Sequence, residues 1–126
     1  MSLVARILIG LQGLGSLIIL TALWLAPVQM AKALQVEPVG LIGSATVRAD
    51  MGGLFAAIAI MMLMAAWKQS RMWALGALVV AGGALVGRLI SVVMDGSGPG
   101  IWAPIGIEVF AVATLLWARS LWRTPA

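Results

Sequence analysis

The sequence predicts an all-α membrane protein in which four transmembrane helices pack as a bundle, with a short amphipathic segment between helices one and two. Three observations support this prediction. Of the 126 residues, 63% are hydrophobic and only 10% are charged. Four apolar runs each approach the ~20 residues that cross a hydrocarbon core. The polar and turn-forming residues lie between these runs. A soluble domain of this size needs more polar surface, so residues 1–126 are expected to form a single integral membrane domain.

The four spans are predicted at residues 3–26, 45–67, 72–94 and 101–121. Pro27 ends the first run, a polar turn at 68–71 follows the second, and a glycine-rich segment at 95–100 follows the third. Ser44 or Thr46 is expected to cap the second helix. The first run is longer than the core of a signal peptide, so we interpret it as a retained helix.

The segment between Pro27 and Pro38 has helical periodicity. Polar Gln29, Lys32 and Gln35 recur every three residues, opposite Met30, Ala31 and Leu34. This pattern predicts a short amphipathic helix on the outer surface of the membrane, and an ordinary helical loop remains the alternative.

Lysine and arginine are concentrated on one side of the predicted bundle. That side carries Arg6, Lys68, Arg71, Arg119 and Arg123, whereas the opposite side carries only Lys32 and Arg48. The positive-inside rule therefore predicts that both termini lie in the cytoplasm. Because the basic residues form no continuous face, membrane orientation explains them better than nucleic-acid binding does.

Small residues recur on the second and third predicted helices. Membrane helices approach closely at such residues, since lipid supplies no hydrophobic force between them. The residues expected at helix contacts are Gly52, Gly53, Gly83, Gly87 and Ser91. Contacts within the chain are the main expectation, and one glycine face serving a dimer or a larger partner is the alternative.

Arg88 and Glu108 are the most informative residues, because each lies inside an apolar run. A charge at the centre of a transmembrane helix costs roughly 2.5–3.5 kcal/mol on insertion scales, which favours an oppositely charged partner at similar depth. Both lie roughly 10 Å from the outer end of their helices at 1.5 Å per residue. Five charged residues are predicted to converge near this end: Arg48, Asp50, Arg88, Asp95 and Glu108. The cluster either fixes helix register as an ion pair or lines a ligand, proton or ion pocket.

These residues also carry a family resemblance. The segments 48–53 (RADMGG), 87–91 (GRLIS) and 95–96, together with Glu108, resemble a family of small four-helix bacterial membrane proteins catalogued as a domain of unknown function. The architecture is more distantly similar to DoxX-like proteins. The resemblance implies a multi-pass protein of the bacterial inner (plasma) membrane and implies no activity.

Enzymatic function is not expected. The chain has no histidine and no cysteine, which excludes thiolate nucleophiles and most zinc sites, and no phosphate loop is present. No metal and no cofactor are predicted. We predict a non-enzymatic accessory subunit of a membrane assembly, or a subunit that binds a small molecule such as a lipid, quinone or pigment. Its expected partners are the lipid bilayer and a larger membrane-protein complex or homo-oligomer. Two alternatives stay open: a small proton-coupled transporter using Glu108 and Asp95, and a purely structural ion-paired bundle.

Overall fold

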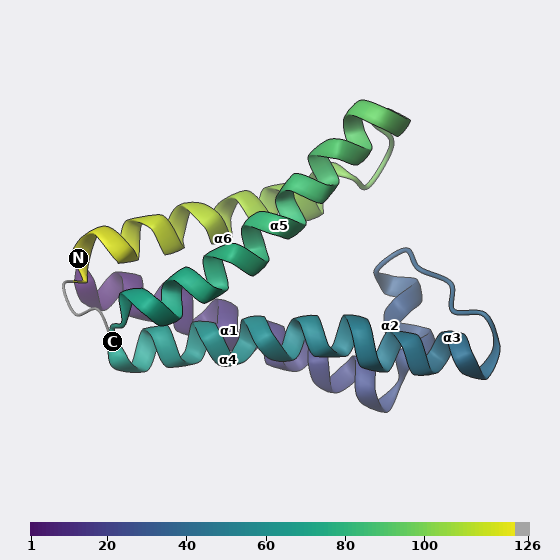
Figure 1. Cartoon of the computed structure of the whole chain (residues 1–126), viewed down its shortest axis with the longest axis horizontal. Coiled ribbons are helices and arrows are strands. Elements are labelled where there is room, and N and C mark those ends of the chain that lie inside the picture. The colour runs from purple at the N-terminus through teal and green to yellow at the C-terminus, as the bar shows by residue number, and fades with distance from the viewer. Residues whose placement is uncertain (123–126) are drawn as a thin grey trace.

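The computed structural model describes residues 1–122, and this part of the chain is helical with short connections (Figure 1). The prediction of an all-α fold with four long apolar helices is confirmed. Within residues 1–122, four helices are long and apolar enough to cross a membrane: Ser2–Leu25, Gly40–Lys68, Arg71–Asp95 and Trp102–Leu121. They are α1 (Ser2–Leu25), α5 (Arg71–Asp95), α6 (Trp102–Leu121) and one continuous helix. That continuous helix consists of α3 (Gly40–Thr46), the π-helical turn η1 (Val47–Met51) and α4 (Gly52–Lys68).

The second long helix begins at Gly40, five residues before the predicted start at 45. The expectation that Ser44 or Thr46 caps it is wrong, because its N-cap is Val39 and no side chain caps it. Thr46 instead lies inside the helix, where its hydroxyl donates a hydrogen bond to the Ile42 carbonyl at 3.0 Å. A threonine that bonds four residues back satisfies its hydroxyl without ending a helix.

The predicted turn between the second and third spans is confirmed. Gln69 follows α4 in the left-handed conformation with φ 48°, and the chain reverses over two residues, Gln69 and Ser70. Ser70 then caps α5, since its side chain accepts a hydrogen bond from the Trp73 backbone N–H at 3.4 Å. After this short reversal, α5 runs antiparallel to α4.

The segment after α1 forms α2 (Pro27–Ala33), so the predicted short helix is present. Proline at its first position suits the fixed φ of that residue. Ala31 is buried against Leu23 and Val47, whereas Gln29 and Lys32 are exposed. The helix is therefore amphipathic and covers one end of α1 and η1.

The long helices form two antiparallel pairs, α1 with α4 and α5 with α6, and the pairs meet through α4–α5 and α1–α6 contacts. We call the end where α1 begins and α6 ends the basic end, and the opposite end the open end. At the basic end the main core joins all four helices, and both ends of the described chain lie there. Toward the open end the α5–α6 pair diverges from the α1–α4 pair (Figure 1).

The close approaches between helices occur at three glycines. A Cβ on Gly13 of α1 would lie 2.9 Å from Leu63 Cγ of α4, and one on Gly76 of α5 would lie 2.8 Å from Met61 Sδ. A Cβ on Gly52 would lie 2.6 Å from the Trp24 indole nitrogen. Among the predicted packing residues, Gly52 therefore does pack closely.

The other predicted packing residues are not places where a neighbouring helix approaches closely. A Cβ on Gly53, Gly83 or Gly87 would have no neighbour within 4 Å, and Ser91 is exposed. For Gly83, Gly87 and Ser91 the physical reason is the divergence of the two helix pairs, since they follow Ala81, the last buried residue of α5.

Candidate functional site

Arg88 of α5 and Glu108 of α6 form an ion pair. The Arg88 Nε donates to Glu108 Oε1 at 2.7 Å. Arg88 lies seven residues before α5 ends and Glu108 six residues after α6 begins, so both lie about 10 Å from the connecting loop. A distance of 2.7 Å is typical of a strong charge-assisted hydrogen bond. Oppositely charged side chains at the same distance from the α5–α6 loop therefore join two candidate spans.

Both side chains continue the buried stripes of their helices. Residues seven apart lie within about 20° of each other around an α-helix. Arg88 follows buried Ala74 and Ala81 of α5 at this spacing. Glu108 precedes Leu115 of α6 at the same spacing, and Leu115 is completely buried. Arg88 and Glu108 therefore lie on the sides of their helices that face the bundle.

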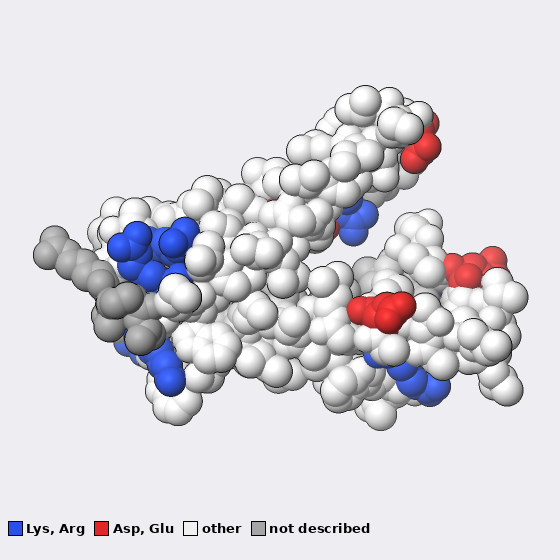
Figure 2. Space-filling view, viewed as in Figure 1, with Lys and Arg blue, Asp and Glu red and all other residues white. Residues whose placement is uncertain are grey.

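The bundle is not closed around this pair. The Arg88 side chain is 44% exposed, whereas that of Glu108 is 16% exposed. No residue of α5 beyond Ala81 is buried. Figure 2 shows the corresponding hollow between the two helix pairs at the open end. The pair therefore lies on the wall of an opening instead of inside a packed core.

The ion pair leaves hydrogen-bonding groups unused. Glu108 Oε2 is buried and has no hydrogen-bond partner among residues 1–122. Within the same residues Arg88 makes a hydrogen bond only through Nε, so its two terminal nitrogens are unpaired. The site can donate hydrogen bonds to an acceptor oxygen from Arg88, while Glu108 balances the arginine charge.

The other three predicted cluster residues do not pair with Arg88 or Glu108. Arg48 lies in η1, which packs against α1 and α2 in the other helix pair. Its Nε donates to the Trp24 carbonyl at 3.0 Å, and the Trp24 indole N–H donates to the Arg48 carbonyl at 3.2 Å. Asp50 and Asp95 are exposed and form no ion pair with the described residues. The structure thus brings together two of the five predicted residues. Arg48 and Asp50 lie in the other, diverging helix pair, and Asp95 lies at the end of α5, seven residues beyond Arg88.

Sequence reasoning missed a polar contact between α1 and α6. Gln12 Nε2 donates to Thr114 Oγ1 at 3.0 Å, and the Thr114 hydroxyl donates to the Phe110 carbonyl at 2.9 Å. Thr114 is buried. Each residue is an isolated polar group in a long apolar run, and that pattern is the signal that could have paired them.

Comparison with known proteins gives one match. A family described as "Domain of unknown function (DUF4345)" matches residues 4–119, which include the Arg88–Glu108 pair and all four long helices apart from the first two residues of α1 and the last two of α6. No curated protein and no solved structure matches the chain. The family match agrees with the resemblance expected from the sequence. Since it covers most of the 126 residues, the chain belongs to the DUF4345 family, a family of unknown function.

Proposed function

We propose that this protein is a non-enzymatic accessory protein of the bacterial inner membrane that binds a lipid-sized amphipathic molecule, such as a lipid, quinone or pigment, in the opening beside Arg88. Four apolar helices support a multi-pass membrane location. In this proposal the basic end faces the cytoplasm, in agreement with the positive-inside rule.

The observation that carries the proposal is the half-exposed Arg88 beside the mostly buried Glu108. If the pair only fixed helix register, packing would be expected to enclose both partners, because an exposed ion pair stabilises a fold by only about 0–1 kcal/mol. Here the glutamate is covered and the arginine remains accessible from the opening. This asymmetry favours an arginine that donates to the polar group of a bound molecule.

The surroundings suit the remainder of such a molecule. The opening lies between helices that are apolar around most of their circumference, and Arg88 is the sole lysine or arginine from Met72 to Ala118. Ligand sites commonly combine apolar walls with a few polar groups that fix orientation. A long apolar tail along the helices and one acceptor oxygen at Arg88 match this arrangement.

Mass spectrometry of the full chain purified in mild detergent tests this proposal. The wild-type protein should retain a bound amphipathic molecule, and the double variant Arg88→Gln with Glu108→Gln should lose it while remaining folded, since the two amides leave no uncompensated charge. Arg48→Gln is the matched control, because Arg48 lies in the other helix pair. A wild-type protein without ligand, or equal ligand in both variants, would contradict the proposal.

A proton-coupled transporter is the second candidate, and the buried, unpartnered Glu108 Oε2 is the observation that favours it. This candidate predicts that Glu108→Gln abolishes proton flux in proteoliposomes. Asp95 contributes less to it, because Asp95 is exposed at the end of α5. Proton flux that is absent from the wild-type protein, or unchanged in the variant, would exclude Glu108 as a coupling residue.

A further inference from the structure

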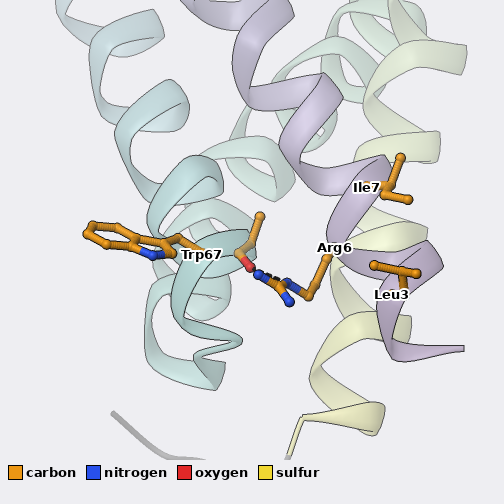
Figure 3. A pocket seen from close by; sticks show the side chains of 5 residues that line it. Leu3, Arg6, Ile7 and Trp67 are labelled. Atoms are coloured by element: carbon orange, nitrogen blue, oxygen red, sulfur yellow. Dashed lines mark hydrogen bonds between the residues drawn. The ribbon is translucent and has the colours of Figure 1, made fainter.

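A second hollow lies at the basic end, between the beginning of α1 and the end of α4. It has a volume of about 350 Å³ and is lined by Leu3, Arg6, Ile7, Ala66 and Trp67. Figure 3 shows Arg6 between the two helices, with Leu3 and Ile7 along α1 on one side and the Trp67 indole on the other. Leu3, Ile7 and Trp67 are all exposed, and Trp67 is 72% exposed. One cation is thus flanked by exposed apolar groups.

One hydrogen bond holds the Arg6 side chain in place, and its other N–H groups remain able to donate. Its Nε donates to the Ala66 carbonyl at 3.0 Å (Figure 3). The Ser70 N–H donates to the Ala65 carbonyl. The Ala66 carbonyl comes next in the chain and belongs to the last turn of α4, where carbonyls have no N–H partner within the helix. A cation there also interacts favourably with the helix dipole. The terminal nitrogens of Arg6 make no hydrogen bond within residues 1–122 and can still donate to an anion.

The charge around this hollow has one sign. Arg6, Lys68 and Arg71 lie at helix ends there, and Arg119 lies in the last turn of α6. The four acidic residues of the chain all lie toward the open end: Glu37, Asp50, Asp95 and Glu108. Figure 2 shows blue surface without red at the basic end, whereas the open end carries the large red patches together with further blue ones. Among residues 1–122, no Asp or Glu side chain at the basic end competes for Arg6.

We propose that this hollow binds one anionic glycerophospholipid. The lipid phosphate accepts hydrogen bonds from the terminal nitrogens of Arg6, which match phosphate oxygens in geometry. One acyl chain lies along Leu3 and Ile7, and the Trp67 indole lies at the depth of the ester groups, where tryptophan is enriched in membranes. This site is separate from the Arg88 opening and does not depend on the function proposed for it.

Native mass spectrometry of the full chain, titrated with phosphatidylglycerol or phosphatidylcholine in detergent, tests this inference. Phosphatidylglycerol should bind more tightly than phosphatidylcholine, because the choline cation offsets the phosphate charge and is repelled by the basic residues of this end. Arg6→Gln should weaken phosphatidylglycerol binding at least about tenfold, since a hydrogen bond to a charged group accounts for about tenfold or more. Lys68→Gln is the matched control. Lys68 lies at the same end but does not line the hollow, so this variant removes only the general attraction between one cation and an anionic lipid. Its phosphatidylglycerol affinity should therefore fall by no more than about fivefold. Equal losses in the two variants would refute the site.

A second pair of variants covers the case in which Arg6→Gln fails to fold. Trp67→Ala should weaken phosphatidylglycerol binding severalfold, whereas Trp102→Ala, which removes an exposed tryptophan near the open end, should leave it unchanged. Identical behaviour of these two variants would overturn the inference. Millimolar glycerol 3-phosphate should not displace the lipid, because it cannot fill the apolar part of the hollow. Displacement would mean that the site recognises a free phosphate and not a lipid.

Discussion

Removal of the Arg88 side chain provides the most direct test of the ion pair. In Arg88→Ala, Glu108 Oε1 loses the donor at 2.7 Å, and Glu108 Oε2 already lacks a partner among the described residues. Breaking a fully buried pair costs about 3–5 kcal/mol, whereas an exposed pair contributes about 0–1 kcal/mol. With Arg88 at 44% and Glu108 at 16% exposure, the expected cost lies between these limits, at about 2 kcal/mol of unfolding free energy. This corresponds to a roughly thirtyfold smaller folding constant.

A double-mutant cycle separates this ionic interaction from other effects of the truncation. Adding Glu108→Gln to Arg88→Ala should restore about half of the lost stability, because the amide removes the uncompensated charge. Unfolding in detergent, followed by tryptophan fluorescence against an SDS gradient, provides the measurement. Asp95→Asn is the control and should change stability by no more than about 0.5 kcal/mol, since Asp95 is exposed. If Arg88→Ala unfolds like the wild type, or if the two single costs simply add, the ion pair does not stabilise the bundle.

Three further predictions follow from the packing and the topology. Gly13→Val should cost about 1–3 kcal/mol by forcing α1 away from Leu63, whereas Gly53→Val should be nearly neutral, and equal thermal stabilities would contradict the packing. Thr114→Val should cost about 0.6–1.7 kcal/mol of unfolding free energy, the range of polar contacts between membrane helices, and a neutral result would mean that the contact with α1 contributes nothing. Since the chain lacks cysteine, Ser97→Cys should react with a membrane-impermeant maleimide from the periplasm and Gln69→Cys only after permeabilisation; the reverse pattern would invert the proposed orientation.

The helical segments could be predicted from the sequence because their signals are local. The lengths of the apolar runs, Pro27 and the 68–71 turn predict the order of the spans. Three predicted spans differ from the observed helices by at most one residue at each end. The amphipathic pattern of α2 was equally local. The second helix begins five residues before its predicted start, because Val39–Ile42 is also apolar. Polar residues such as Thr46 do not end it, since their hydroxyls bond within the helix.

The site could be predicted only in part, because counting residues along a helix gives depth but not lateral position. Arg88 and Glu108 were matched in depth and belong to neighbouring helices, so they meet. Arg48 and Asp50 lie in the α1–α4 pair, and the divergence of the two pairs is not encoded in helix length or composition. Similarly, helices that are apolar on all sides do not reveal which glycines face a neighbour. The contacting Gly76 and the open Gly83 therefore look alike in the sequence.

The length of the helix Gly40–Lys68 has a consequence for how the protein fits its bilayer. Its 29 residues extend about 43 Å, whereas a hydrocarbon core is about 30 Å thick. Tilting alone would have to reach about 45°, beyond the usual limit of about 40°. The last 18 residues, Met51–Lys68, measure about 27 Å and match the core by themselves, which leaves Arg48 and Asp50 among the lipid headgroups. A thicker bilayer would draw these two charges into hydrocarbon, so hydrophobic mismatch should disfavour this protein in thick membranes.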